Sequence, residues 1–288
     1  MLWQKSRRSD NVVQDTGGGG RFGGGRGLGL GGIVLVIIAS LVFGKNPLEI
    51  LQLLGGGMEG VDSGAGQQTT PAGHDAQTDF VKAVLGSTED VWGEAFQASG
   101  QRYPAPRLVL FRGGVQSACG AASSAMGPFY CPGDRQVYLD LDFFREMQQR
   151  FNASGDFARA YVIAHEVGHH VQNVIGVMGQ VERAAQGGQP MQGADGLSVR
   201  QELQADCFAG VWANHAQRKL AWLEQGDVEA ALNAANQIGD DTLQRQSRGV
   251  VVPDSFTHGS SAERVRWFRT GMASGNLRSC DTFAASRL

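Results

Sequence analysis

The chain has 288 residues, of which 42% are hydrophobic and 18% are charged. This length is sufficient for one sizeable folded core with additional segments. The formal charge of −3 gives no electrostatic basis for binding nucleic acid, so we expect no nucleic-acid partner.

Glycine is concentrated near the start of the chain, where residues 17–32 read GGGGRFGGGRGLGLGG. A segment of this composition cannot bury enough apolar surface to fold by itself. We therefore predict that residues 1–26 form a disordered, glycine-rich tail.

An uncharged apolar segment follows at residues 27–44, GLGLGGIVLVIIASLVFG, and it is just long enough to span a bilayer. A buried core helix and a cleavable signal peptide are the alternatives, but Ser40 is the single polar residue of the stretch 33–43 and no small-x-small cleavage site is obvious. Basic residues precede the segment and acidic residues follow it. This predicts a retained single-pass anchor in the cell inner membrane, with a cytoplasmic N-terminus and the bulk of the protein in the periplasm or outside the cell.

Residues 45–74 are rich in Gly, Ser, Thr and Gln and are predicted to form a flexible linker, so that the folded domain covers residues 75–288. Apolar residues at helical spacing predict a helix on each side of Thr88, which we expect to act as a cap between them. Further helices are predicted over residues 156–175, 198–217, 227–238 and 261–272.

Two short, apolar and β-prone segments are the best candidates for strands: RLVLF at residues 107–111 and QVYLDL at residues 136–141. The expected fold class is α+β and mainly helical, with a short antiparallel sheet. An exposed edge at residues 136–141 could pair with an extended substrate peptide. The alternative is that both strands only pack beneath a helix.

The chain contains four cysteines. An even number outside the cytoplasm suggests two disulfides. The short separation favours a bond between Cys119 and Cys131, which leaves Cys207 with Cys280. Sequence alone allows other pairings, and free buried thiols are the alternative.

Residues 160–172, AYVIAHEVGHHVQ, contain the motif H-E-x-x-H at His165, Glu166 and His169. On a helix, histidines four residues apart lie on one face and can bind one cation, while the glutamate can reach a water on that cation. Imidazoles and carboxylates are costly to bury without partners. We therefore predict one catalytic Zn²⁺, with a satisfied pair of core histidines as the alternative.

Catalytic zinc usually takes three protein ligands. The metzincin arrangement is excluded because Ile175 stands where its third histidine would be. We predict Glu202, in QELQADCFAG, as the third ligand, with Asp206 behind it as the hydrogen-bond partner of a ligating histidine. An ordinary solvated acidic face is less favoured because the surrounding residues are apolar. The rival third ligands are His215, His258 and Glu182.

The motifs HEVGH and ELQAD together are similar to the gluzincin arrangement. The segments SACGAASSAMGPFYCPGDRQVYLDLDFF, QELQADCFAGVWA and SFTHGSSAERVRWFRTG closely resemble the neutral zinc metallopeptidase family of bacterial membrane-anchored proteins. The resemblance covers essentially the whole chain. It implies a zincin-like peptidase domain and supplies no physiological substrate.

The predicted function is zinc-dependent hydrolysis of peptide bonds in proteins or peptides outside the cytoplasm. Glu166 would take a proton from the metal-activated water and later pass it to the leaving amine. His258 could stabilise the tetrahedral intermediate, although a structural role is equally open, and Tyr130 and Tyr138 are weaker candidates. The alternatives are a non-catalytic binding module stabilised by zinc and a zinc hydrolase of cell-wall peptide.

Overall fold

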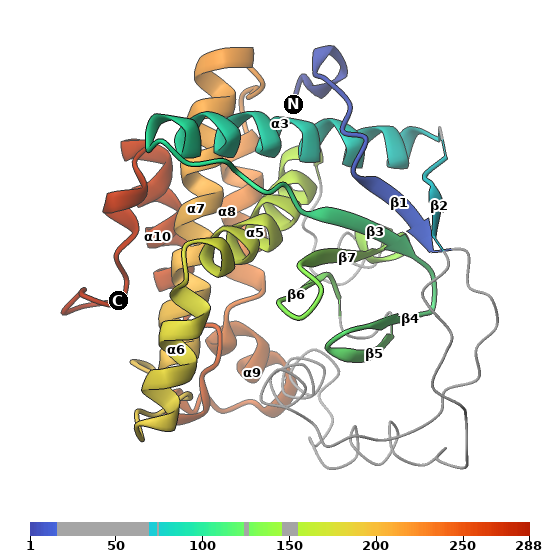
Figure 1. Ribbon diagram of the computed structural model, residues 1–288. Helices are drawn as coiled ribbons and strands as arrows, with labels where there is room; N and C mark the ends of the chain where they lie inside the picture. Colours follow the sequence, from blue (N-terminus) through green and yellow to red (C-terminus); the bar gives the residue numbers. More distant parts are fainter. Residues whose placement is uncertain (16–68, 74, 124–126, 146–154) are drawn as a thin grey trace, which may run out of the picture.

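The computed structural model describes residues 1–15, 69–73, 75–123, 127–145 and 155–288. The predicted anchor at residues 27–44 and most of the predicted linker lie outside these ranges. Among the residues that are described, no helix is both long and apolar enough to cross a bilayer. This part of the chain is a mainly helical α+β fold, as predicted (Figure 1).

A five-stranded sheet has the strand order β2-β1-β3-β7-β6. The inner pairs β1–β3 and β3–β7 are parallel, whereas the outer pairs β1–β2 and β6–β7 are antiparallel. The prediction of an antiparallel sheet is therefore wrong for the inner strands, whose connections are long enough for a parallel crossover. The strands are β1 (Val12–Asp15), β2 (Thr69–Pro71), β3 (Arg107–Phe111), β6 (Phe129–Cys131) and β7 (Gln136–Asp140).

The predicted strand at residues 136–141 corresponds to β7, which lies between β3 and β6. Residues 136–138 of β7 pair with both β3 and β6, so the expectation of an exposed edge is wrong for them, whereas residues 139 and 140 pair only with β3 among the described residues. Among the described residues, β6 is the edge strand next to β7. β6 also packs against helix α5 (Asp156–Val174), which carries the H-E-x-x-H motif.

A separate two-stranded hairpin, β4 (Gly114–Ser117) and β5 (Gly120–Ser123), follows β3. Cys119 at its turn is bonded to Cys131 at the end of β6, and Cys207 is bonded to Cys280. Both disulfides are the pairs predicted from the sequence.

The first fifteen residues belong to the folded domain, so the prediction of a disordered tail is wrong for them. A 3-10 helix, η1 (Trp3–Lys5), precedes β1, which lies between β2 and β3 in the sheet. Arg8 donates two hydrogen bonds of 2.7 Å to the carboxylate of Asp79. The predicted linker is likewise ordered at β2. The prediction extended the glycine-rich tail too far toward the N-terminus. The glycine run begins only at residue 17, after the residues 1–15 that pack against the domain.

Helix α3 (Ala76–Ala98) runs across the sheet and the other helices (Figure 1). It is one continuous helix, capped by Asp75, whose carboxylate accepts hydrogen bonds from the backbone of Gln77 and Thr78. Thr88 is therefore not a cap between two helices. It is fully buried, and its hydroxyl donates to the Leu85 carbonyl within the helix at 2.7 Å, so its polar group is satisfied locally.

Helices α7, α8 and α10 gather on the other side of α5 from the sheet (Figure 1). α7 and α10 approach closely through Gly210 and Gly271, where a Cβ atom would overlap the backbone of the facing helix. The remaining helices are α6 (Val177–Gln186), α7 (Leu197–Leu220), α8 (Asp227–Gln237), α9 (Asp240–Arg248), α10 (Ser261–Ser274) and the 3-10 turns η3 (Pro253–Ser255) and η4 (Leu277–Cys280).

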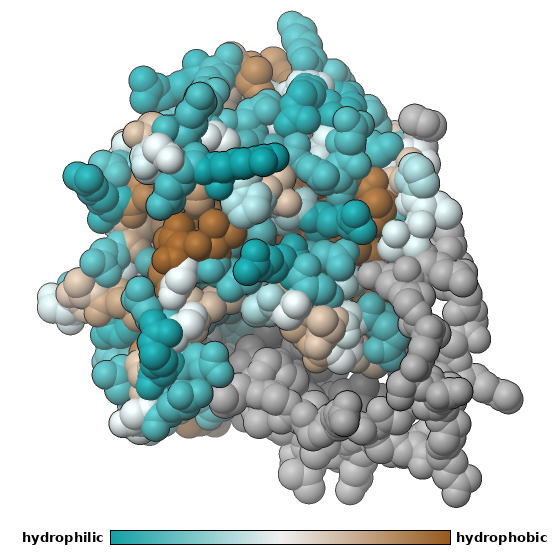
Figure 2. All heavy atoms as spheres, in the orientation of Figure 1, coloured by the Kyte–Doolittle hydropathy of each residue, from teal (hydrophilic) through white to brown (hydrophobic). Residues whose placement is uncertain are grey.

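The face seen in Figure 2 is mostly polar, with an apolar patch over the region where α5 ends and α6 begins. Ile175, the C-cap of α5, is 41% exposed there. The adjacent Gly176 adopts a left-handed conformation, with a φ of 83°, which ends α5 and redirects the chain into α6.

Candidate metal centre

Three donor side chains converge between α5 and α7. Nε2 of His165 lies 3.1 Å from one carboxylate oxygen of Glu202, and Nε2 of His169 lies 3.5 Å from the other. One ligand atom from each residue lies within 4.8 Å of the others. All three side chains are at least largely buried. The structure thus brings together the three residues predicted as metal ligands.

This donor set fits a divalent cation such as zinc. Two imidazole nitrogens and one carboxylate are common zinc ligands, and a three-residue set leaves a coordination position open. Without a cation, the pKa of His169 is raised, because interaction with the Glu202 carboxylate outweighs the lowering by burial. The pKa of Glu202 is held well below its ordinary value, because attraction to His169 and His165 outweighs the effect of burial.

Two of the rival third ligands, His215 and Glu182, lie in other contacts, whereas His258 interacts with Glu202 and is described below. His215 is hydrogen-bonded through Nε2 to the carbonyl of Gly275 at 2.8 Å. Glu182 lies on α6 and accepts a hydrogen bond from Gln186 on the protein surface. Glu202 lies 37 positions after His165 in the sequence, so only the packing of α5 against α7 brings the two side chains together.

Asp206 supports His165, as predicted. Its Oδ1 lies 2.8 Å from Nδ1 of His165, and the residue is fully buried. Arg264 on α10 donates to both carboxylate oxygens at 2.8 and 2.9 Å, and Tyr161 donates a third hydrogen bond. Burial would raise the pKa of Asp206, but Arg264 and His165 outweigh it and lower this pKa to about 2. The carboxylate of Asp206 therefore stays ionised and can accept a hydrogen bond from Nδ1–H of His165.

Arg264 was not predicted as part of this centre. Its guanidinium is nearly fully buried and reaches Asp206 across 58 positions of sequence. The only signal in the sequence was a basic residue on an otherwise packed helix, and such a signal does not identify its partner.

His169 is supported by a different group. Its Nδ1 lies 2.9 Å from Oε1 of Gln172, one turn further along α5. Gln172 is fully buried. The sequence argument did not identify Gln172 as a partner of His169. The i, i+3 spacing on a helix could have identified it.

Glu166 lies beside the donors and is 8% exposed. Burial raises the pKa of its carboxyl group, and the nearby His169 and His165 oppose this increase. A carboxylate with a raised pKa accepts a proton more readily than an exposed glutamate does. The residue therefore has the environment expected of a general base.

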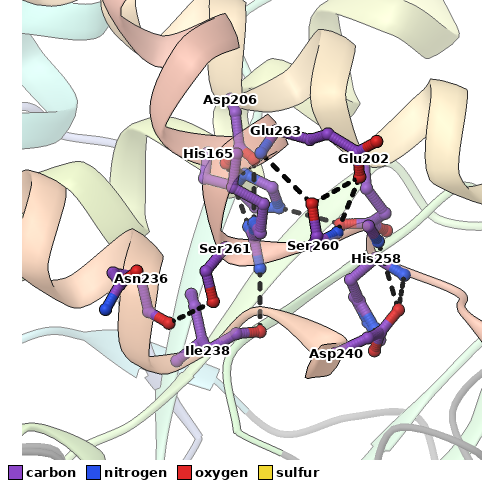
Figure 3. Close-up of polar contacts among 12 residues, drawn as sticks. His165, Glu202, Asp206, Asn236, Ile238, Asp240, His258, Ser260, Ser261 and Glu263 are labelled. Atoms are coloured by element: carbon purple, nitrogen blue, oxygen red, sulfur yellow. Dashed lines mark hydrogen bonds and ion pairs between the residues drawn. The ribbon is translucent and has the colours of Figure 1, made fainter. Parts of the chain in front are cut away.

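His258 lies between η3 and α10, in a loop organised by Asp240 (Figure 3). One oxygen of Asp240 accepts from the backbone nitrogens of Thr257, His258 and Gly259 at 2.6 to 3.1 Å, and the other lies 3.2 Å from Nδ1 of His258. Burial lowers the pKa of His258, but attraction to Asp240 outweighs it, and Glu202 adds to the increase. The sequence argument did not identify Asp240.

The start of α10 is fixed by a capping box of Ser260 and Glu263. The two tyrosines considered at the sequence level lie in other networks. The Tyr138 hydroxyl donates to Asp134 at 2.7 Å, away from the donors, whereas Tyr130 accepts from Asn173 at 2.8 Å and contacts His170. His258, by contrast, lies close enough to Glu202 for the two charges to attract each other.

The family model described as "Putative neutral zinc metallopeptidase" matches residues 1–283 of this chain. The Escherichia coli K12 protein "Uncharacterized protein YpfJ" is 46% identical over 291 residues, which covers 99% of this chain and 100% of that protein. "Uncharacterized protein Mb2605" of Mycobacterium bovis is 44% identical over 218 residues, 72% of this chain and 71% of that protein. No solved structure matches the chain. The match over nearly the full length shows that the chain belongs to the family described as putative neutral zinc metallopeptidases.

Proposed function

We propose that this protein is a zinc-dependent peptidase that hydrolyses peptide bonds of proteins or peptides outside the cytoplasm. The observation that carries the proposal is the convergence of His165, His169 and Glu202 within 4.8 Å, with the buried Glu166 beside them. Membership of a zinc metallopeptidase family supports the same reaction class.

In this proposal, His165, His169 and Glu202 hold the ion. When zinc is bound, it supplies Lewis acidity, which polarises a peptide carbonyl and acidifies a water molecule. The carboxylate of Glu166 takes the proton of that water and later delivers it to the leaving amine. The raised pKa of Glu166 suits both steps, since the group must hold the proton between them.

His258 donates a hydrogen bond from Nε2 to the carbonyl oxygen as that oxygen becomes negative. Asp240 holds the other ring nitrogen and favours the protonated imidazole, so both ring nitrogens carry hydrogen. We assign Asp240 as a positioning residue, because it contacts His258 and the loop backbone.

An extended substrate would add to the sheet at β6, the strand that packs against α5. Main-chain pairing at such an edge binds peptides with little dependence on side chains. The disulfide from Cys131 to the β4–β5 hairpin holds this edge in place.

We also propose that the protein acts outside the cytoplasm, because two disulfides are typical of oxidising compartments. We place it at the membrane because residues 27–44 are uncharged and apolar. The parallel pairing of β1 with β3 supports placing residues 1–15 on the same side of the membrane as the peptidase domain. This proposal replaces the expectation of a cytoplasmic N-terminus.

The test is the isosteric variant Glu166→Gln. It removes the base and leaves the ligands, so we expect stoichiometric zinc with cleavage of an unfolded protein reduced by at least about 10²-fold. His169→Ala is the control that should lose both zinc and activity. Wild-type protein that holds zinc but cleaves nothing in a broad peptide library would favour a binding module. Cleavage confined to cell-wall peptide would favour that alternative substrate.

A further inference from the structure

A chain of three hydrogen bonds leads from His169 to the C-terminal segment. Nδ1 of His169 lies 2.9 Å from Oε1 of Gln172. Nε2 of Gln172 donates to Oε1 of Gln204 at 3.0 Å, and Nε2 of Gln204 donates to the carbonyl of Cys280 at 3.0 Å. The two glutamines and Cys280 are buried, so water does not replace these contacts easily.

The last acceptor sets the direction of every bond in this chain. A backbone carbonyl can only accept, so the amide nitrogen of Gln204 must face Cys280 and its oxygen must face Gln172. Gln172 therefore presents its nitrogen to Gln204 and also to the Gln201 carbonyl, at 2.7 Å. Its oxygen is left to face His169, which requires hydrogen on Nδ1. In the neutral imidazole, the lone pair of Nε2 is then free to face the other two donors.

The position of the Cys280 carbonyl depends on the disulfide to Cys207. Cys207 lies on α7, three residues after Gln204, and both cysteines are fully buried. The C-terminal segment is also held by Arg200, whose Nη1 donates to the carbonyl of Thr282 at 2.6 Å. The disulfide thus holds the acceptor beside the helix that carries the amide.

The two histidines differ in how they are supported. His165 is held by an ion pair between Asp206 and Arg264, whereas His169 is held by neutral amides whose order depends on Cys280. A neutral chain is weaker than a charged one and can be disturbed at its far end.

We propose that Gln204 and the Cys207–Cys280 disulfide are positioning elements that keep His169 in the tautomer able to bind metal. The proposal rests on the proposed function in one respect, that His169 is a metal ligand. It predicts that the metal affinity of this centre depends on a disulfide that contacts none of the three donors.

The test is the zinc dissociation constant, measured by competition with a chelator at fixed pH for the full-length protein. Gln204→Met keeps an unbranched side chain but ends the hydrogen-bond chain, and we expect zinc to bind about 10- to 100-fold more weakly. Gln201→Met is the matched control: it lies next to Glu202 on the same helix, but its backbone carbonyl, not its side chain, belongs to the network. This control should bind zinc within about 2-fold of wild type.

The second variant, Cys207→Ala with Cys280→Ala, leaves Gln204 in place and gives the same test if Gln204→Met does not fold. Its control is Cys119→Ala with Cys131→Ala, which removes a disulfide outside the chain. Nitrogen NMR of His169 in the metal-free protein, at a pH high enough for the imidazole to be neutral, gives a readout independent of catalysis: Nδ1–H should dominate in wild type and in both controls, with mixed tautomers in the test variants.

Wild-type affinity in both test variants would overturn the proposal and leave the proposed function intact. An equal loss in the Cys119 and Cys131 control would also overturn it, since the effect would then reflect general stability. Failure of the wild type to bind zinc would remove both this proposal and the peptidase assignment.

Discussion

The indole nitrogen of Trp3 donates a hydrogen bond of 2.8 Å to the carboxylate of Asp156, although 153 positions separate the two residues. Asp156 begins α5, the helix that carries His165 and His169. The Trp3 ring also packs edge-on against Phe80 of α3, with ring centroids 5.4 Å apart. The N-terminal segment therefore contacts the helix of the metal centre directly.

Deleting residues 1–15 should prevent stable folding of the remaining chain. The deletion removes β1 from between β2 and β3 and exposes the groups that it covers. Thermal unfolding would show a lost or much lower transition, which a synthetic peptide of residues 1–15 added in trans should partly restore. Trp3→Phe, which keeps the ring but loses the donor, should cost only about 1 kcal/mol. An unchanged transition after the deletion would contradict the assignment of this segment to the domain.

Residues near both ends of the chain should be labelled from the same side of the membrane. Lys5 and Ser286 are exposed, so Lys5→Cys and Ser286→Cys each offer one free thiol, since the four native cysteines are paired. In intact cells, an impermeant maleimide should react with both variants or with neither. Reaction with only Ser286→Cys would restore the single-pass arrangement expected from the sequence.

Gly271→Ala should destabilise the protein strongly. Its new methyl group would overlap the backbone at Cys207, so α10 would have to move away from α7 and carry Arg264 from Asp206. The expected loss is at least about 3 kcal/mol in chemical unfolding. Gly93→Ala is the matched control: it lies in α3 with open space around it and should stabilise by about 0.5–1 kcal/mol. Equal effects of the two substitutions would contradict this account.

His170 should make the metal-free protein less stable in mild acid. Burial lowers the pKa of its imidazole from 6.5 to about 4. Between these values the unfolded chain binds a proton that the folded protein excludes, so stability falls as the pH falls from 6.5 to 4. The contribution is on the order of 3 kcal/mol. Urea unfolding with a chelator present should show a flatter pH dependence for His170→Gln than for wild type. If stability depended on pH in the same way in both proteins, His170 would not be the source of the loss in acid.

His258→Gln should lower kcat by about 10²-fold and leave zinc affinity nearly unchanged, because the side chain stabilises developing charge and does not ligate. Asp240→Asn should lower the pKa of His258, since Asp240 is the attraction that raises it. As the pH rises, His258 should therefore lose its proton, and the variant its activity, at a lower pH than in wild type. A pH–rate profile for both proteins gives the check, and a loss of zinc in His258→Gln would point to ligation instead.

The local parts of the centre could be predicted from the sequence. The H-E-x-x-H motif lies on a helix because apolar residues recur at helical spacing, and the capping box of Ser260 and Glu263 is also a short-range pattern. The third donor could be proposed because Glu202 lies in a second apolar helix, where an unpaired carboxylate needs a partner.

Other parts of the centre required the tertiary structure. Nothing local to Arg264, Asp240 or Gln204 indicates its partner, since these contacts join separate elements and depend on how those elements pack. The error at residues 1–15 has the same origin: a short segment beside a glycine-rich run cannot fold alone, yet it is stable between two strands of a larger sheet.

The sequence by itself therefore determined which residues could hold and use a metal ion, because the H-E-x-x-H spacing is set within one helix and Glu202 stands in a second apolar helix. Only the tertiary structure decided what supports each ligand and where the N-terminal segment lies. Hydrogen bonds between distant positions form when long-range packing brings a donor and an acceptor together and excludes water, and no local pattern encodes that packing.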